Sequence, residues 1–452
     1  MTAQARVGKG ARASSGGGLA LLGGEPIGAP AMDQHPNFSR EAIDRVSDLL
    51  ARGKSVGLSK FDPYISEAET SVAKWHGVKF CLGTSTGHAA LHAALIGLEI
   101  TDGDEVITTP YSWGASVSCI LQNNAIPVFA DVSPVTGLLN PGSIEAVITP
   151  KTRAILVVHI FGQPANMTAI CAIAKKHGLA VIEDGSQAHG ARHGNKLVGG
   201  FGDASGFSCM GAKLLATTEA GYLVTNRDDV YWKACLSTQH LTGSPVRPGR
   251  AAELGFPEDL LPFADSLTYT YRLSTVNAVL LSEQIKRVDR ANAGRHENVE
   301  LFKKALGQSE VMSFPEFTNG DSPTYHYLSM NFDADRAGVS RDTYVAALRA
   351  EGLVGATAYV PSPIYKWLRL DPDAGGPRTM WQANIRRSGR FYGDLALPGC
   401  EAKIAHSLEL PWNYIQPDQA RIQDLAQVFY KLEEHLPTLR EWEWEHRSAD
   451  SS

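Results

Sequence analysis

The chain has neither an apolar run long enough to cross a membrane nor a cysteine pattern that would bind a metal. None of its apolar stretches approaches the ~20 residues of a transmembrane helix. Its 6 cysteines are scattered, with no CxxC pair and no Cys/His spacing typical of zinc sites. We therefore expect a cytoplasmic protein with reduced thiols, without a membrane partner and without a metal.

A strong positive charge and the common nucleotide-binding motifs are missing as well. The net charge is -6 at pH 7, so the composition gives no reason to expect a nucleic-acid partner. The small-residue turn TSTGHAAL at residues 84–91 lacks the GxGxxG and GxxxxGK spacings, which argues against a dinucleotide site and a P-loop. What remains is an ordinary globular composition, with 43% apolar and 20% charged residues.

The length of 452 residues and the order of the apolar segments predict an α/β protein of two domains. Short β-branched runs alternate with helical patterns in the first half, which is typical of a mostly parallel sheet with helices on both faces. The predicted parts are a disordered leader at 1–17, a large domain at 18–272, a linking helix and small α+β domain at 273–440, and a tail at 441–452.

The individual strands and helices can be placed from the same patterns. Strands are predicted at residues 105–109, 126–132, 153–160, 179–185, 204–208 and 221–226. Helices are predicted at residues 41–52, 87–98, 165–177, 273–304, 340–351 and 417–436. Ligands of parallel sheets bind at the carboxyl ends of the strands, so the residues that follow these runs are the candidate site residues.

Lys213 lies in the stretch GDASGFSCMGAKLLATTEAG, with no other charged residue between Asp203 and Glu219. A lysine in small and apolar surroundings is desolvated more easily than it is paired, and desolvation favours the neutral amine. A neutral amine can attack a carbonyl carbon and form a Schiff base. The alternative is a lysine that extends from a helix start into water.

Three further groups follow predicted strands. The turn at residues 84–91 offers helix-terminal amides and hydroxyls such as that of Thr86 to a phosphate, although any small-residue helix cap has the same pattern. Tyr111 or Trp113 could stack on a planar ring or belong to the core. Asp184 could hold a pyridine nitrogen protonated, cap the next helix or bind a metal.

The order of these groups along the chain is more specific than any one of them. Phosphate turn, aromatic residue, carboxylate and then lysine is the order of fold-type I enzymes that depend on pyridoxal 5'-phosphate. Ser208 and Lys213 lie five residues apart across a turn, which would place a hydroxyl and the amine at one edge of the sheet.

At this point the chain resembles the DegT-type sugar and cyclitol aminotransferases, over roughly residues 19–435. The resemblance is carried by long gapless motifs, among them LALLGGEP, CLGTSTGHAALHAAL, GDEVITTPYSW, VIEDGSQAHGA and GDASGFSCMGAK. It implies the fold-type I architecture with pyridoxal 5'-phosphate as cofactor. It also implies a homodimer with both active sites at the interface, in which residues 269–272 reach the neighbour's site.

The resemblance assigns a role to each site residue. Lys213 would form the Schiff base, Asp184 would contact the pyridine nitrogen and Gln187 would lie beside the phenolic oxygen of the ring. Trp113 would stack on the ring. The phosphate would be surrounded by Thr86, Gly87, His88 and Ser208.

Three positions depart from the family pattern. His88 stands where the family usually has threonine, and residues 218–221 replace Gly-Glu-Gly-Gly. Thr270 replaces an asparagine that commonly reaches the partner's phosphate, where threonine would keep a weaker hydrogen bond. We expect these changes to reshape the acceptor site while cofactor binding is kept.

The resemblance implies reversible amino transfer from glutamine or glutamate to a keto-cyclitol or keto-sugar in secondary, aminoglycoside-like metabolism. A nucleotide-linked 4-ketosugar is the alternative acceptor. Dehydration or aromatisation on the same scaffold, and a regulatory role without catalysis, stay open. His326 and Tyr365 are candidate substrate contacts, with surface or core positions as the alternative.

Overall fold

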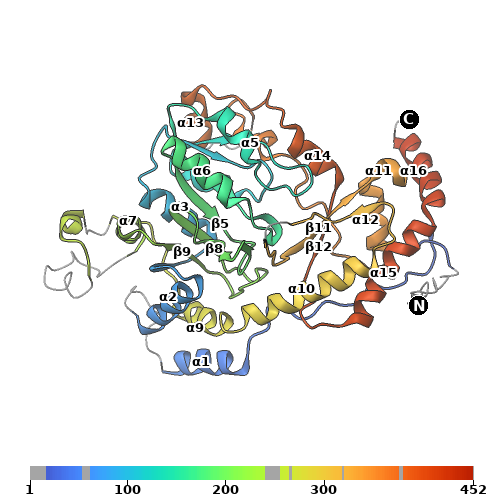
Figure 1. The fold of residues 1–452 in the computed structure, drawn as a ribbon, viewed down its shortest axis with the longest axis horizontal. Helices are drawn as coiled ribbons and strands as arrows, with labels where there is room; N and C mark the ends of the chain where they lie inside the picture. The colour runs from blue at the N-terminus through green and yellow to red at the C-terminus, as the bar shows by residue number, and fades with distance from the viewer. Residues whose placement is uncertain are drawn as a thin grey trace, which may run out of the picture.

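The computed structural model describes residues 17–52, 62–239, 255–263, 267–317, 320–375 and 380–450. The predicted leader therefore lies outside the described residues, apart from Gly17. A search of the described helices for one that is both long and apolar enough to span a bilayer finds none. The described chain forms two main sheets that lie next to each other along the long axis of the molecule, with the long helix α10, Val288–Ala305, running past both (Figure 1).

The larger sheet has the strand order β1-β9-β8-β5-β4-β2-β3. Within its described strands β9 alone is antiparallel to its neighbours, so the predicted α/β class with a mostly parallel sheet is confirmed. The six predicted strands are all present, and one more at the edge was not predicted. The strands are β1 Phe80–Thr84, β2 Glu105–Thr108, β3 Ile126–Phe129, β4 Thr152–Val158, β5 Ala180–Asp184, β8 Ala204–Ser208 and β9 Gly221–Thr225.

Helices cover both faces of this sheet, which explains why its strands are buried almost throughout rather than at alternate residues. On β4, Leu156 packs in a cluster that includes residues of α3, α4 and α7, whereas the adjacent Ile155 packs in a cluster that includes α6. A third cluster joins the sheet to α2 and α9. The helices are α2 Pro63–His76, α3 Gly87–Gly97, α4 Ala115–Gln122, α6 Met167–His177, α7 Asp228–Thr238 and α9 Thr275–Gln284.

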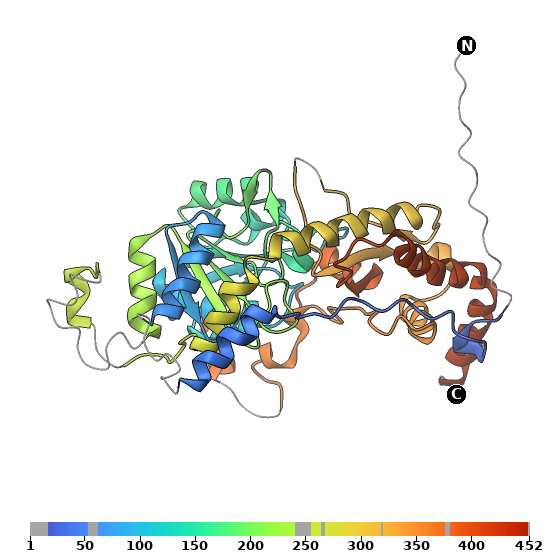
Figure 2. The same cartoon turned by 90° about the horizontal axis from the view of Figure 1, so that it is seen from below.

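The smaller sheet consists of β10 Met312–Ser313, β11 Tyr327–Phe332 and β12 Ser407–Pro411, paired antiparallel. Helices α10, α12 Arg341–Ala350 and α15 Gln419–Glu434 contribute to its apolar cluster. The entry segment also packs here, since Leu19 is part of this cluster and the amides of Ala20 and Ile27 donate to the Glu351 carboxylate. Figure 2 shows this segment running from α1, Arg40–Ala51, back along the molecule to the smaller sheet.

One helix prediction is wrong in detail. The helix predicted at 273–304 is two helices, α9 and α10, although neither glycine nor proline marks the break at 285–287. The break follows tertiary contacts: Gln284 donates to the carbonyl of Ala216, while Ile285 and Val288 both pack in the cluster beneath the larger sheet. Packing thus overrides a continuous helical pattern.

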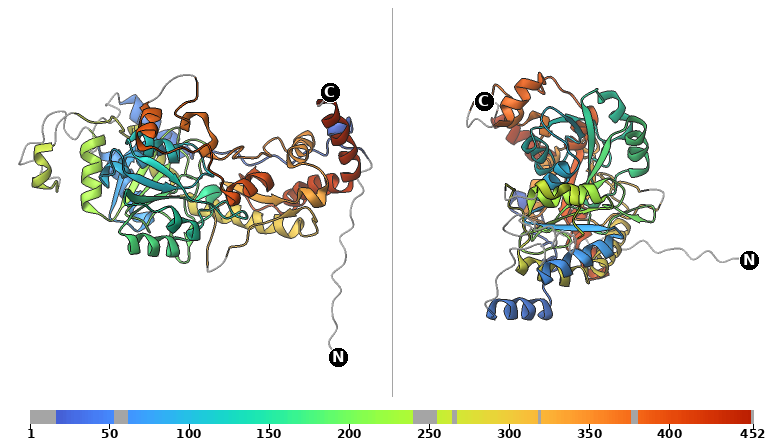
Figure 3. Two further views of the ribbon diagram at one scale, coloured as in Figure 1. Left: turned by 90° about the horizontal axis from the view of Figure 1, so that it is seen from above. Right: turned by 90° about the vertical axis from the view of Figure 1, so that its left-hand side faces the viewer.

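In the described chain, residues 441–450 of the predicted tail form part of α16, Leu436–Asp450. Its first turns are held by packing and by side chains. Leu439 is buried against the smaller sheet's cluster, and the Arg440 side chain donates to the carbonyl of Ala337. The Glu443 carboxylate accepts hydrogen bonds from Ser340, the cap of α12. The first described residues and α16 therefore both lie at the smaller-sheet end of the molecule (Figure 3).

A buried carboxylate fixes the strand that leads to the candidate site. Glu183 on β5 is fully buried and accepts hydrogen bonds from the amides of Gly199, Phe201 and Gly202 at 2.7–2.8 Å. His159 adds a bond of 3.1 Å. Burial alone would raise the pKa of Glu183, but these hydrogen bonds outweigh it and the pKa lies below its ordinary value.

We expect Glu183→Gln to destabilise the protein by roughly 2–4 kcal/mol, because an amide cannot satisfy the same set of converging donors. Since the folded-state pKa is depressed, the stabilisation is present above the unfolded value and is lost as pH falls through the folded value. Urea denaturation at pH 7 and at pH 4 would measure both effects. Glu300→Gln, at a half-exposed ion pair with Lys303, is the control and should change stability by less than about 0.5 kcal/mol.

Candidate active site

The carboxyl ends of the parallel strands bring the predicted residues to one edge of the larger sheet. Thr84 ends β1, Asp184 ends β5 and Ser208 ends β8, and Gly221 begins the antiparallel β9 at the same edge. Pairing fixes this arrangement, because Gly221 is the register partner of both Thr84 and Ser208. The turn to Lys213 leaves from Ser208.

The amino end of α3 approaches this edge closely. A Cβ on Gly87 would lie 2.5 Å from the Cβ of Ser208, and one on Gly221 would lie 2.3 Å from the backbone of Thr86. Thr86 caps the helix by accepting from the amide of Ala89 at 3.0 Å. The amides of the first helical turn before Ala89 have no acceptor within the described chain, so this end of α3 can bind an anion.

Asp184 is held as a buried acceptor with capacity to spare. Its Oδ2 accepts from Ser116 Oγ at 2.7 Å, and its Oδ1 accepts from the amide of Ser186 at 3.0 Å. The residue is 5% exposed. A carboxylate has about four acceptor positions, so a further N–H donor, such as a pyridinium nitrogen, can still be accommodated. The Ser186 contact lies in a turn, since the next described element after Asp184 is the strand β6, Arg192–His193, and not a helix that the carboxylate could cap.

Lys213 has its backbone held while its amine is left without a partner. The Lys213 amide donates to Met210, and the Lys213 carbonyl contacts His35 Nε2 at 2.7 Å. Across the described residues, no hydrogen bond or ion pair reaches Nζ. Burial lowers the pKa of Lys213, although the negative charges of Asp184 and Glu219 act in the opposite direction. The carboxylate of Asp184 is thus near enough to act on the amine but forms no ion pair with it.

The two candidate aromatic residues, Tyr111 and Trp113, differ clearly in burial. Tyr111 is fully buried, and its hydroxyl contacts Ser407 and Glu409 at 3.2 Å, so it is a core residue. Trp113 directly precedes α4 and is 64% exposed. An exposed indole three residues before Ser116, the partner of Asp184, is available to stack on a planar ring.

Gln187 and His326 lie near these groups. Gln187 Oε1 accepts from the amide of Phe161 at 2.7 Å, and its Nε2 donates to the Tyr359 hydroxyl at 3.1 Å, which leaves one N–H free. Burial, together with the nearby positive charge of Lys213, holds the pKa of His326 well below its ordinary value. Its ring is therefore neutral, and no described residue forms a hydrogen bond with it.

Other predicted residues do not join the group through their side chains. The imidazole of His88 is turned to α4, where it contacts Gln122 and Ser118. Thr270 lies on the segment that is attached beside Thr84. Tyr365 is 2% exposed in an apolar cluster, and its hydroxyl donates to Glu401 at 3.0 Å, so the core alternative describes it.

Sequence reasoning missed Ser116 and Tyr359. Ser116 binds the carboxylate that was predicted, and its position in TTPYSWGAS gave a signal that could have found it. Tyr359 binds Gln187, and the charge of Asp184 helps to raise its pKa, so it lies close to both. No local pattern marks Tyr359, because it comes from a segment 172 residues away from Gln187.

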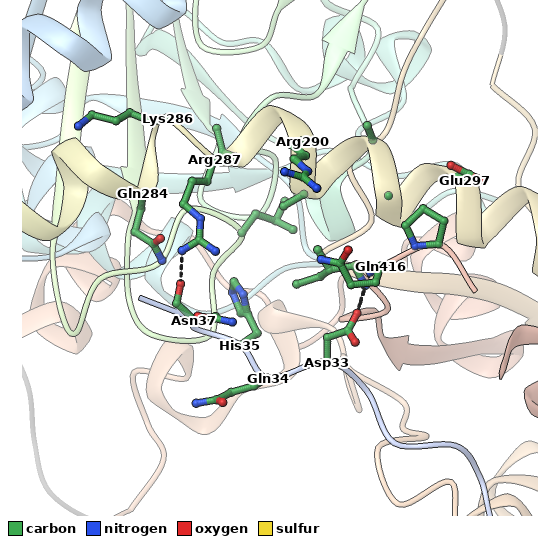
Figure 4. Close-up of a pocket in the computed structure, with 17 residues that line it drawn as sticks. Asp33, Gln34, His35, Asn37, Gln284, Lys286, Arg287, Arg290, Glu297 and Gln416 are labelled. Atoms are coloured by element: carbon green, nitrogen blue, oxygen red, sulfur yellow. Dashed lines mark hydrogen bonds between the residues drawn. The ribbon is translucent and has the colours of Figure 1, made fainter. Parts of the chain in front are cut away.

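A cavity of about 750 Å³ adjoins the Lys213 loop but is a separate space. It is bounded by residues 33–37, the α9–α10 junction and residues 415–417, and Leu214 also lines it. Figure 4 shows Arg287 bonded to Asn37 across it, with Asp33 bonded to Gln416 at the other end. None of the predicted site residues lines this cavity, so it is not the site at the strand ends.

Comparisons with known proteins identify relatives along most of the chain. The model of the DegT/DnrJ/EryC1/StrS aminotransferase family matches residues 37–374. An L-glutamine:2-deoxy-scyllo-inosose aminotransferase of Streptoalloteichus tenebrarius is 30% identical and covers 93% of this chain and 99% of its own. A pleiotropic regulatory protein of Geobacillus stearothermophilus is 32% identical over 75% of this chain and 86% of its own.

A solved structure shows the same fold. The aminotransferase of Psychrobacter cryohalolentis superposes with a TM-score of 0.78 and 27% identity, covering 90% of this chain and all of that one.

The lowered pKa of Lys213 can be measured directly. Competitive acetylation of the cofactor-free protein at graded pH, with mass spectrometry of the Lys213 peptide, should give a titration midpoint below 10.5. Acetylation of the exposed Lys175 serves as the internal reference for the reactivity of the reagent. Asp184→Asn should move the midpoint further down, because the carboxylate favours the charged amine. A midpoint at or above 10.5 would contradict the desolvated amine.

Proposed function

The chain belongs to the DegT/DnrJ/EryC1/StrS aminotransferase family, whose members use pyridoxal 5'-phosphate, and from this premise we propose that it transfers the amino group of L-glutamine to a keto-cyclitol. The observation that carries the proposal is the buried Lys213 amine, which has no partner within the described residues and lies under the influence of Asp184. The relative from Streptoalloteichus tenebrarius, similar over almost its whole length, supports the donor and the acceptor class.

The groups at the strand ends fit the cofactor. Lys213 would hold its aldehyde carbon, and Asp184 would accept from its ring nitrogen with the oxygen positions left by Ser116 and Ser186. The amides at the start of α3 would bind its phosphate in the space kept open by Gly87 and Gly221. Bound there, pyridoxal 5'-phosphate supplies an electron sink for the substrate Cα.

The residues of the chain then divide the work of proton transfer. The neutral amine of Lys213 would act as the general base that moves the proton of the donor's Cα. The Asp184 carboxylate, whose oxygens otherwise accept from Ser116 and Ser186, would hold the ring nitrogen. The exposed indole of Trp113 would stack on the ring, and Gln187 would offer its remaining N–H to the ring oxygen.

Two other functions have some support. The Geobacillus stearothermophilus relative favours a regulatory role, but an unpaired buried amine beside a carboxylate is costly and is unnecessary for a purely structural scaffold. A nucleotide-linked 4-ketosugar remains the second acceptor. His326 lies near Lys213 and is the remaining candidate for contact with the acceptor.

The assembly and domain organisation belong to the same proposal. We expect a cytoplasmic homodimer in which residues 269–272 of each chain reach the other site. Apolar clusters around the two sheets support two domains, proposed at 18–272 and 273–440. Part of the second range packs on the larger sheet, however, since Leu281 of α9 joins one of its clusters and Val360 and Cys400 join another. Leu19 packs on the smaller sheet, which argues for counting the entry segment with the second domain.

Incubation of the holoenzyme with L-glutamine tests the proposal. We expect the absorption band of the pyridoxal form of the cofactor to disappear. The band should return when 2-deoxy-scyllo-inosose is added, and mass spectrometry should then detect the amino-cyclitol. Lys213→Ala should lower this turnover by at least about 1000-fold, because one residue holds the cofactor and moves the proton.

The controls separate the alternatives. Ser143→Ala, far from the site on the short helix α5, Pro141–Ile144, should keep wild-type turnover. If the band of the pyridoxal form returned with a nucleotide-linked 4-ketosugar and not with the keto-cyclitol, the 4-ketosugar would be the acceptor. No spectral change with any amino donor would overturn transamination.

A further inference from the structure

The imidazole of His88 is engaged inside the protein at both of its nitrogens. Its Nε2 lies 2.5 Å from Gln122 Oε1, and its Nδ1 lies 3.3 Å from Ser118 Oγ. An amide oxygen only accepts, so Nε2 carries the hydrogen and donates to Gln122, while Nδ1 lies against the serine hydroxyl. The first turn of α3 is thereby tied to α4.

The chain of hydrogen bonds continues from Gln122 to Tyr271. Gln122 Nε2 donates to the Tyr271 hydroxyl at 2.8 Å, and this hydroxyl lies 2.9 Å from His92 Nδ1. Because the hydroxyl accepts from the glutamine, its own hydrogen points to His92. Burial lowers the pKa of His92 to about 4, so its ring is a neutral acceptor. The bonds therefore run in one direction from His88 through Gln122 and Tyr271 to His92.

Tyr271 is also attached through its backbone. Its carbonyl accepts from the amide of Ser85 at 2.8 Å, and its own amide donates to the carbonyl of Thr238 at 3.1 Å. The next residue, Arg272, forms a β-bridge with Thr84. The phosphate-binding turn and the segment at residues 269–272 consequently share one anchor, and Tyr271 is its centre.

The helix α4, which takes part in this series of hydrogen bonds through Gln122, also contacts Asp184, the carboxylate proposed to bind the cofactor ring. Gln122 is the last residue of α4, and Ser116 in the first turn of the same short helix donates to Asp184. A helix of two turns is a stiff connection. A displacement at Tyr271 is therefore carried to the turn before α3 through Ser85, and to α4 through Gln122.

We propose that His88, Gln122 and Tyr271 are positioning residues that fix the phosphate-binding turn for the cofactor without touching it. The inference rests on the proposed cofactor site. It gives the His88 side chain a role other than phosphate contact, while its backbone amide stays at the amino end of α3. The same chain of bonds holds the segment that carries Thr270.

The test compares two ligands that differ by the phosphate. Cofactor-free Tyr271→Phe is titrated with pyridoxal 5'-phosphate and with pyridoxal, and binding is followed by quenching of tryptophan fluorescence. We expect the Kd for pyridoxal 5'-phosphate to rise roughly 3- to 10-fold, and that for pyridoxal to change less than about twofold. The matched control is Tyr392→Phe, which loses a buried hydroxyl bond of 2.7 Å to Pro127 in another part of the larger sheet. It should leave both Kd values unchanged even if the melting temperature falls.

A second variant tests whether the residues act as one unit. His88→Ala should raise the Kd for pyridoxal 5'-phosphate by a similar factor, and the double variant should bind no more weakly than the weaker single variant, within about twofold. The proposed positioning role would be overturned by any of three results. The increases in Kd could multiply in the double variant, the affinity for both ligands could fall equally, or the affinity for pyridoxal 5'-phosphate could stay unchanged in both single variants. A wild-type protein that binds no pyridoxal 5'-phosphate would instead overturn the proposed cofactor site.

Discussion

The structure depends on keeping an amine buried and unpaired at the end of a parallel sheet. Burying a charged lysine is costly, and the cost is reduced if the amine is neutral or gains a partner when a ligand binds. The Lys213 loop makes this possible because its backbone is fully engaged, by Met210 and by His35, while its side chain reaches no described partner. The amine of Lys213 is therefore available to bond to the carbonyl carbon of a ligand.

Two adjacent carboxylates on β5, those of Glu183 and Asp184, have different surroundings and therefore different roles. Successive residues of a strand point to opposite sides. Glu183 is buried among backbone amides and His159, where it fixes the strand, whereas Asp184 ends the strand and keeps acceptor positions free. Since both are acidic and adjacent, composition alone cannot distinguish them. Their hydrogen-bond partners do.

Much of the fold could be predicted because it is encoded locally. Five of the six predicted strands contain β-branched residues, and helices α1 and α12 begin at the serine caps, Ser39 and Ser340, that the sequence marks. The order of turn, aromatic residue, carboxylate and lysine is also a local signal, and the family comparison agrees with it. The break between α9 and α10 and the docking of α16 could not be predicted, since they depend on contacts between distant residues, such as Glu443 with Ser340, 103 positions apart.

The sequence singles out the candidate reacting groups but not the residues that support them. Lys213 and Asp184 have distinctive chemistry, whereas Ser116, Tyr359 and Gln122 are ordinary residue types whose role comes only from what they contact.

The departures from the family pattern follow the same logic. At position 88 a larger side chain is accommodated because α4 supplies Gln122 and Ser118 to bind it. Thr218 is similarly bound through its hydroxyl by Asn277 at 2.7 Å, and Gly221 is retained where a Cβ would meet Thr86. The changes at His88 and Thr218 are thus accommodated by hydrogen bonds inside the protein.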